Sequence, residues 1–218
     1  MNKKIRDELF VTGCDHKTEW QLPWFLKNFK KQRNKTKIII TDFGMSQDMV
    51  NKVVKHPCVE AIMTMDTKGK ERGWFKKPLS MYHVPAKKAV WLDTDCQVLA
   101  NIDNMFSMLK PNMLNMVEDK PWTKRRGEVW YNSGVVGFVD KPTVLAQWCN
   151  VVHSQQNIGD QEMLHSMLNP ITQLANINPL PNEYNVMRLQ VEQDNYKGRI
   201  KIMHWTGEKG NDTIRSMM

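Results

Sequence analysis

Residues 89–99 read Ala89-Val90-Trp91-Leu92-Asp93-Thr94-Asp95-Cys96-Gln97-Val98-Leu99, an apolar run followed by two aspartates spaced by one residue. Side chains two positions apart on a strand point to the same face of the sheet. We therefore predict that Asp93 and Asp95 leave the end of a strand together, as two carboxylates on one side. Such a pair suits Mg²⁺ or Mn²⁺, which commonly share their coordination shell with phosphates. In open α/β sheets the ligand crevice lies at this end of the strands.

An Asp-x-Asp pattern alone is weak evidence, because chance produces it about once in a chain of this length. The haloacid-dehalogenase phosphatases also end an apolar strand in Asp-x-Asp. Their pattern has Thr or Val two residues after the second aspartate, where this chain has Gln97, and it lies near the N-terminus rather than in mid-chain. The sequence therefore disfavours that alternative.

The rest of the chain alternates short apolar runs with segments of helical periodicity. Ser46 is typical of a helix N-cap, and Pro142 is typical of a helix start. We predict strands at 9–12, 37–41, 59–63, 89–92 and 135–139, and helices at 19–31, after Ser46 and after Pro142. This alternation predicts an α/β fold with a mostly parallel central sheet flanked by helices.

Composition favours one cytoplasmic domain. The chain has 218 residues, of which 41% are hydrophobic, enough for one core and short for two. Its longest apolar runs fall short of the roughly 18 residues that a membrane span needs. Residues 1–8 turn acidic where a secretory signal would be apolar. The four cysteines are widely spaced, which favours reduced core residues over disulfides or a zinc site.

The net charge of +8 is concentrated in two clusters, residues 68–77 and 120–126. They form either a solvated surface or a cleft that attracts a diphosphate donor or an acidic acceptor. A basic surface also permits peripheral contact with a membrane. Specific nucleic-acid binding is not expected, because the chain carries no recognised nucleic-acid motif and basicity alone gives only non-specific affinity.

Three later segments add to the Asp-x-Asp pair. They are Trp130-Tyr131-Asn132-Ser133-Gly134-Val135, Gly159-Asp160-Gln161-Glu162-Met163-Leu164 and His204-Trp205-Thr206-Gly207-Glu208-Lys209. In this order the four segments resemble the GT-A glycosyltransferases, and most closely family 8, the retaining nucleotide-sugar transferases that include glycogenin and the lipopolysaccharide galactosyltransferases. The resemblance runs from about Leu9 to Lys209.

The resemblance implies a single GT-A domain over residues 1–218, with residues 204–218 as a mobile C-terminal segment. It also implies that Asp93, Asp95 and His204 bind the metal, with Asp95 as the direct carboxylate ligand. An imidazole beside two carboxylates suits Mn²⁺ better than Mg²⁺. A hydrogen-bonded structural histidine is the alternative reading of His204.

The same resemblance assigns the donor site. Thr12 and Asp15 match the base-binding segment, and Lys76 or Lys77 matches the basic residue that precedes the Asp-x-Asp strand. Gly207 and Lys209 match the phosphate-binding motif near the C-terminus. Here the lysine comes one residue early, and Gly210-Asn211 replaces the Pro-Trp of the family.

Asn132 and Ser133 match residues that hold the donor sugar, although Asn-Ser-Gly is also ordinary turn chemistry. Asp160 and Gln161 match the catalytic motif, where they would position the sugar and stabilise charge. Because Asp160 precedes an apolar helical run, it could instead be a helix N-cap.

The expected function is transfer of a hexose, from UDP-sugar as donor, to an acceptor glycan, lipid or protein that the sequence does not identify. The expected cofactor is Mn²⁺ or Mg²⁺. The alternatives are a sugar-nucleotide-binding module without transferase activity and a nucleotidyltransferase of related fold. The latter would carry a Gly-rich, Lys/Arg-containing loop after the first strand, and residues 12–17 match that pattern poorly.

Overall fold

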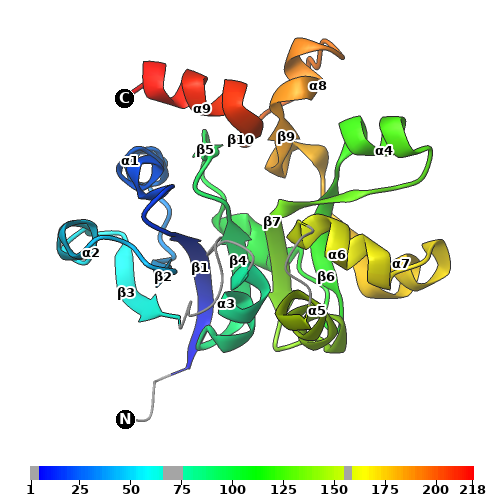
Figure 1. Ribbon diagram of the computed structural model, residues 1–218, viewed down its shortest axis with the longest axis horizontal. Coiled ribbons are helices and arrows are strands. Elements are labelled where there is room, and N and C mark those ends of the chain that lie inside the picture. The colour runs from blue at the N-terminus through cyan, green and yellow to red at the C-terminus, as the bar shows by residue number, and fades with distance from the viewer. Residues whose placement is uncertain (1–4, 66–75, 155–158) are drawn as a thin grey trace.

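The computed structural model describes residues 5–65, 76–154 and 159–218 (Figure 1). Its centre is a seven-stranded sheet with the strand order β3-β2-β1-β4-β7-β6-β8. These strands are β1 (Arg6–Cys14), β2 (Ile38–Asp42), β3 (Val59–Thr64), β4 (Ala86–Leu92), β6 (Leu114–Glu118), β7 (Tyr131–Val139) and β8 (Ile177–Pro179).

The sheet is mostly parallel, as the sequence predicted. Strands β3, β2, β1 and β4 run parallel to one another, and β8 runs parallel to β6. Only β7 runs against its neighbours, β4 on one side and β6 on the other. Consequently the beginning of β7 lies at the same edge of the sheet as the carboxyl ends of β4 and β6.

Helices cover both faces of the sheet (Figure 1). The α-helices are α1 (Leu22–Lys31), α2 (Gln47–Val53), α3 (Lys77–His83), α4 (Lys120–Arg126), α5 (Thr143–Ser154), α6 (Asp160–Met167), α7 (Pro170–Asn176), α8 (Arg188–Glu192) and α9 (Gly207–Ser216). Short 3₁₀ turns are η1 (Glu19–Gln21), η3 (Asp103–Ser107) and η4 (Asn182–Tyr184). In the parts of the chain that are described, no helix combines the length and apolar character needed to cross a bilayer.

Two hydrophobic cores lie on opposite faces because strand side chains alternate. Leu9 and Val11 of β1 join the core beneath α3, α5 and α6, whereas Phe10 joins the core beneath α1. All three side chains are almost completely buried. The central strands are therefore apolar on both faces, as expected of a covered parallel sheet.

A second, three-stranded sheet with the order β5-β10-β9 lies beyond the carboxyl edge of the main sheet. Its strands are β5 (Cys96–Val98), β9 (Val186–Met187) and β10 (Ile202–His204). In the antiparallel pairing of β10 with β5, His204 lies opposite Cys96. This pairing brings the C-terminal motif to the Asp-x-Asp segment, more than a hundred residues earlier in the chain.

Most of the predicted elements are present, and Ser46 is the N-cap of α2, since its hydroxyl accepts a hydrogen bond from Met49 N at 3.2 Å. One alternative was wrong: Asn132–Gly134 lie inside β7 and form no turn. The C-terminal segment that was expected to be mobile contains the helix α9, whose Ile214 is completely buried, and its mobility stays a prediction.

The basic cluster at 68–77 falls largely outside the described residues. Its two described members, Lys76 and Lys77, are buried. For them the interpretation as a solvated surface was wrong.

Candidate active site

The four sequence motifs meet at the carboxyl edge of the main sheet. Asp93 follows the last residue of β4, and its backbone N–H donates to the carbonyl of Gly134 at 2.8 Å. This contact follows from the antiparallel pairing of β4 with β7, in which Leu92 lies opposite Val135. On the other side, the backbone N–H of Trp205 donates to the carbonyl of Asp95 at 3.1 Å.

These motifs line one pocket of about 680 Å³, a size typical of small-molecule sites. Nine residues of the predicted site contribute to its lining: Lys77, Asp93, Asp95, Asn132, Ser133, Asp160, Gln161, His204 and Gly207. Together with Gly13, Thr18 and Gln21, which also line it, they show that residues from every quarter of the chain share one cavity.

Four predicted donor-site residues do not line this pocket: Thr12, Asp15, Lys76 and Lys209. Thr12 and Lys76 are buried, and Lys209 is exposed. Asp15 accepts hydrogen bonds from the backbone N–H groups of Lys17 and Thr18. The contacts with a nucleotide that the resemblance assigns to these four donor-site residues remain predictions.

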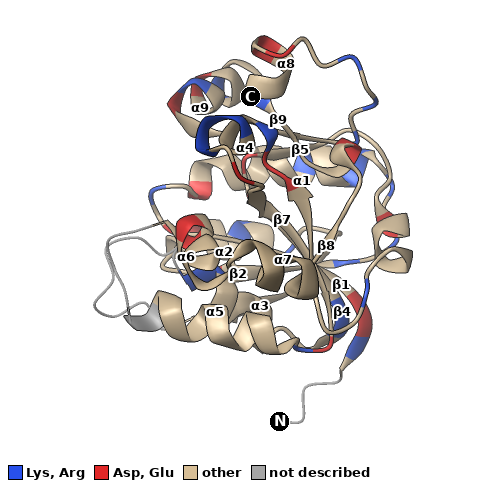
Figure 2. Cartoon of the chain, turned by 90° about the vertical axis from the view of Figure 1, so that its right-hand side faces the viewer, with Lys and Arg blue, Asp and Glu red and all other residues tan. Residues whose placement is uncertain are grey.

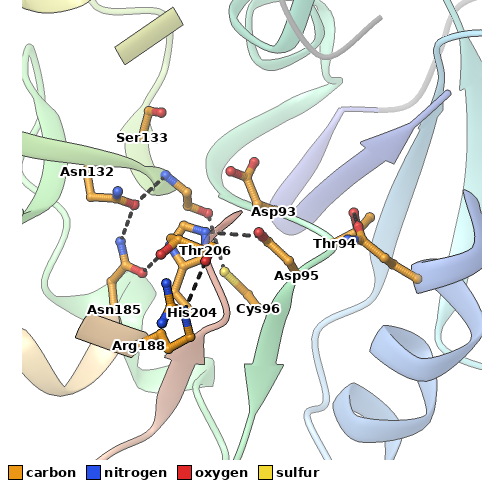
Figure 3. A network of polar contacts seen from close by, with 12 residues as sticks. Asp93, Thr94, Asp95, Cys96, Asn132, Ser133, Asn185, Arg188, His204 and Thr206 are labelled. Carbon is orange, nitrogen blue, oxygen red and sulfur yellow. Dashed lines mark hydrogen bonds and ion pairs between the residues drawn. The ribbon is translucent and has the colours of Figure 1, made fainter. Parts of the chain in front are cut away.

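A candidate metal group lies where β5 meets β10 (Figure 3). Each of Asp95, Cys96 and His204 offers a ligand atom, and these atoms lie within 4.8 Å of one another. His204 Nε2 lies 3.1 Å from Asp95 Oδ1. A carboxylate and an imidazole fit a divalent ion such as Mn²⁺. Burial raises the pKa of the Cys96 thiol well above its usual value, which disfavours the thiolate that a metal would bind.

Two opposing influences act on the pKa of His204. Burial lowers this pKa, but the charge and hydrogen bond of Asp95, together with the charge of Asp93, raise it by more. The net pKa lies above the ordinary value of histidine. In this environment a cation at Nε2, whether a proton or a metal ion, is favoured.

Asp93 is not in that metal group; it interacts instead with the opposite side of the pocket. Its carboxylate accepts hydrogen bonds from the Trp91 indole at 2.5 Å and from Lys77 Nζ at 3.2 Å. The two aspartates thus line the same pocket but take different partners, and only Asp95 lies beside His204.

Lys77 is a buried cation that joins three elements. Besides Asp93, its Nζ contacts Asp160 Oδ2 at 3.0 Å and donates to the carbonyl of Ser133 at 3.0 Å. Burial lowers the pKa of Lys77, but the two carboxylates raise it above its usual value, so the ammonium stays charged. Burial raises the pKa of Asp160, with Lys77 opposing that shift. Because Gly159 is the N-cap of α6, the interpretation of Asp160 as that cap was wrong.

Asn132 and Gln161 belong to one hydrogen-bonded network. Asn132 Nδ2 donates to Gln161 Oε1 at 3.1 Å and to Asp119 Oδ2 at 2.9 Å. Gln161 Nε2 donates to the same Asp119 oxygen at 3.1 Å. Asp119 also caps α4 by accepting from Trp122 N. Sequence reasoning missed Asp119, whose only signal was its place between an apolar strand and a helix with proline in its first turn.

Gly134 provides the space that His204 occupies. A Cβ atom at residue 134 would lie 2.1 Å from His204 Cε1 and 2.9 Å from Asn132 Oδ1. The glycine of the Asn-Ser-Gly motif is thus required for contact between two motifs.

The beginning of α9 closes the pocket on the side of the small sheet. Its N-cap Thr206 and first residue Gly207 both line the pocket, so the positive end of the helix dipole faces it. Gln21 Nε2 donates to Asn211 Oδ1 at 2.8 Å, which links α9 to η1. Gln21 also accepts from the Thr94 hydroxyl, within the Asp-x-Asp turn, at 2.5 Å.

The second basic cluster lies on α4, where Figure 2 shows Lys and Arg side by side. Trp122 of this helix lines the pocket and stacks on Trp130, with the ring centroids 5.4 Å apart. The guanidinium of Arg126 covers both rings at 4.8 and 5.2 Å. This end of the pocket is therefore aromatic, and the basic side chains of α4 lie beside it without lining it.

No family model and no curated protein matches the sequence of this chain. Solved structures match its fold. The glycosyltransferase GlyE of Streptococcus pneumoniae matches with a TM-score of 0.67 and 16% identity, over 94% of this chain and 55% of that chain. The galactosyltransferase LgtC, in complex with donor and acceptor sugar analogues, matches with a TM-score of 0.63 and 13% identity, over 91% and 87%. Mouse xyloside xylosyltransferase 1 matches with a TM-score of 0.57 and 11% identity, over 93% and 98%.

The chain spans about half the length of GlyE and of the bifunctional glycosyltransferase WbbM, of which it covers 46%. It spans 87% of LgtC and 98% of the mouse xylosyltransferase. At these identities the likeness concerns the arrangement of the backbone, which agrees with the fold that the four motifs predicted. The chain therefore has the fold of the GT-A glycosyltransferases.

Proposed function

We propose that this chain is a metal-dependent glycosyltransferase. It transfers a hexose from a nucleotide diphosphate sugar, with UDP as the nucleotide, to an acceptor and retains the anomeric configuration. The observation that carries the proposal is the set of side chains that line the pocket at the strand ends. That pocket joins a carboxylate–imidazole pair, Asp95 and His204, to the amides of Asn132 and Gln161.

Asp95 and His204 would hold the divalent ion, Mn²⁺ or Mg²⁺, through Oδ1 and Nε2. When bound, such an ion neutralises the charge of a diphosphate leaving group as a Lewis acid. Thr206 and Gly207 support the same reading, because a helix N-terminus that faces a pocket favours anions there. The basic helix α4 adds positive charge at the other end of the pocket.

Asn132 and Gln161 would hold the sugar, and Asp160 would act on the charge that develops as the diphosphate departs. Removing one preorganised electrostatic contact of this kind costs on the order of a hundredfold in turnover. We therefore expect Asp160→Asn to lower turnover by about a hundredfold with donor affinity little changed, since a contact made mainly in the transition state affects rate more than binding. Full turnover in this variant, or an inverted product by NMR, would contradict the assignment.

The function is tested by incubating the protein with Mn²⁺ and a panel of nucleotide sugars and measuring the released nucleoside diphosphate. Release should require Mn²⁺ and should be lost in Asp95→Asn, whose side chain lines the pocket and so tolerates substitution without loss of the fold. Donor binding by calorimetry without any release would favour the sugar-nucleotide-binding module. Equal binding of UDP before and after chelation of the metal would remove the metal from the proposal.

A further inference from the structure

A chain of hydrogen bonds leads from the backbone of β7 to His204, and it passes through Asn185, a completely buried residue between η4 and β9 (Figure 3). Gly134 N donates to Asn132 Oδ1 at 2.9 Å, and Asn185 Nδ2 donates to the same oxygen at 2.8 Å. Asn185 Oδ1 lies 3.0 Å from His204 Nδ1. The opposite ring atom, Nε2, faces Asp95.

The direction of each bond in this chain is determined by its first donor. A backbone N–H can only donate, so the atom of Asn132 that meets Gly134 must be the oxygen. The amide nitrogen of Asn132 confirms that orientation independently, because it meets a carboxylate oxygen of Asp119 at 2.9 Å, which can only accept from it.

The same reasoning determines the orientation of the next two groups. Asn185 must present its NH₂ group to the oxygen of Asn132, so its own oxygen faces His204. An amide oxygen can only accept, and the ring atom opposite it must therefore be Nδ1–H. The other ring atom, Nε2, lies 3.1 Å from an oxygen of the Asp95 carboxylate, which can also only accept, so without a metal Nε2–H donates to Asp95. A metal ion bound at Nε2 would take the place of that proton.

We infer that Asn185 is the positioning residue that keeps a proton on Nδ1 of His204 and so directs Nε2 to the metal-binding side. Partners of this kind around a metal-ligating histidine orient the ring and determine which of its nitrogens binds the metal. The network also ties that ring to Asn132, so the proposed metal and sugar subsites share one rigid framework. The metal part of this inference rests on the proposed function; the proton on Nδ1 does not.

The proton on Nδ1 can be measured directly on the protein without metal or nucleotide. ¹⁵N NMR of the histidine rings shows whether each ring nitrogen carries a proton, and the signal of His204 is assigned by its loss in His204→Asn. Nδ1 of His204 should carry a proton in wild type both below and above the pKa of the ring. An unprotonated Nδ1 in wild type overturns the inference, whatever the protein catalyses.

Two variants test the role of Asn185. Asn185→Leu removes the acceptor, so His204 should no longer keep its proton on Nδ1, and Mn²⁺ binding in calorimetry should weaken by about 10- to 100-fold. Asn185→Asp loses the donor to Asn132 but keeps an acceptor for Nδ1–H, and it should retain the proton on Nδ1 and most of the Mn²⁺ affinity. A matched control is Asn178→Leu, because Asn178 is also buried and also donates to an asparagine oxygen, that of Asn115 at 2.8 Å, away from the pocket.

Asn178→Leu should leave the His204 signal and Mn²⁺ affinity unchanged. An Asn185→Leu protein that keeps the proton on Nδ1 of His204 and the wild-type Mn²⁺ affinity would overturn the inference. If Asn185→Leu fails to fold, loss of the Nδ1–H signal in Asn185→Asp has the same force.

Discussion

At the scale of single residues, the candidate site depends most closely on Gly134, because a side chain at this position would collide with His204. The Cβ of an alanine there would lie 2.1 Å from His204 Cε1, and the hydrogen bond of His204 Nδ1 to Asn185 leaves the ring little freedom to retreat. We expect Gly134→Ala to displace the imidazole and to weaken Mn²⁺ binding at least tenfold, the lower range for disturbing the surroundings of a metal ligand. Calorimetry with Mn²⁺ measures the effect.

Gly137→Ala is the control, because it makes the same change in the same strand but in the core. Its Cβ would lie 2.4 Å from Leu109 Cδ2, a side-chain atom remote from the pocket. This variant should lower stability and leave Mn²⁺ affinity unchanged. Equal affinities in wild type and Gly134→Ala would show that His204 is not constrained by β7.

His165 makes stability depend on pH. Its Nε2 accepts a hydrogen bond from Tyr131 N at 2.9 Å, and burial lowers its pKa below the usual value. Between that lowered pKa and about pH 6.5, the value in the unfolded chain, the unfolded state binds more protons than the native state. The stabilisation is therefore complete above about pH 6.5 and is lost progressively as the pH falls.

Urea unfolding at pH 5.5 and 7.5 measures this loss. His165→Gln keeps an acceptor for Tyr131 N but cannot be protonated, so its stability should fall less than that of wild type on acidification. The comparison isolates His165 from His204, whose raised pKa has the opposite effect. An identical loss in both proteins would contradict the assignment.

At the scale of elements, α9 is attached to η1 across the pocket by a side-chain hydrogen bond. Asn211 accepts from Gln21 at 2.8 Å, and Gly210 packs so closely on Trp205 that a Cβ would lie 2.0 Å from its carbonyl oxygen. Asn211→Ala removes this hydrogen bond, which is worth about 1 kcal/mol, so the population of the opened helix should rise about fivefold. We expect the amides of α9 to exchange faster by the same factor.

The matched control is Asp212→Ala, since Asp212 is exposed and forms an ion pair with Arg215 of the same helix, at 3.2 Å. Exchange in α9 should then stay close to that of wild type. If α9 closes over a donor, UDP with Mn²⁺ should slow its exchange in wild type. Faster exchange in both variants alike would mean that Asn211 does not attach the helix.

Elements with a strong local signal could be predicted from the sequence, and those defined by distant partners could not. The apolar runs of β1 and β4 and the cap at Ser46 are local features. Asn132 lies in a strand because Asp119, Gln161 and Asn185 satisfy its amide, and none of these lies near it in sequence. For the same reason tertiary contacts override the turn propensity of Asn-Ser-Gly.

The same distinction, between local signals and distant partners, holds for the residues of the candidate site. The motif resemblance identified His204, but no local pattern marks Asn185, which lies in a short irregular segment. Cys96 is adjacent to the Asp-x-Asp pair, yet its place in the metal group follows from the pairing of β5 with β10, strands of three residues each. Such short strands carry too little alternation to be predicted.

At the scale of the whole molecule, the strand order arranges the subsites. Strands β1, β4 and β7 are neighbours, and the pocket follows that order, from Gly13 through Asp93 to Asn132. The antiparallel direction of β7 is what brings Asn132 to the edge where β1 and β4 end. A parallel β7 would place it at the opposite edge.

Lys77 is the residue that ties this arrangement together, because its one ammonium contacts the end of β4, the start of β7 and the start of α6. Lys77→Met leaves the buried carboxylate of Asp160 without its counter-charge. Breaking a buried pair in this way costs about 3 to 5 kcal/mol. For a chain of this size that is a fall in Tm on the order of 10 °C.

Urea and thermal unfolding of three variants separate the buried pair from charge alone. Lys87→Met removes an exposed partner of Asp7, at 3.2 Å, and should change stability by less than about 1 kcal/mol. Adding Asp160→Asn to Lys77→Met removes the uncompensated charge and should recover part of the loss. If Lys77→Met were as stable as Lys87→Met, the buried ammonium would not hold these elements together, and the close approach of β4, β7 and α6 would rest on apolar packing alone.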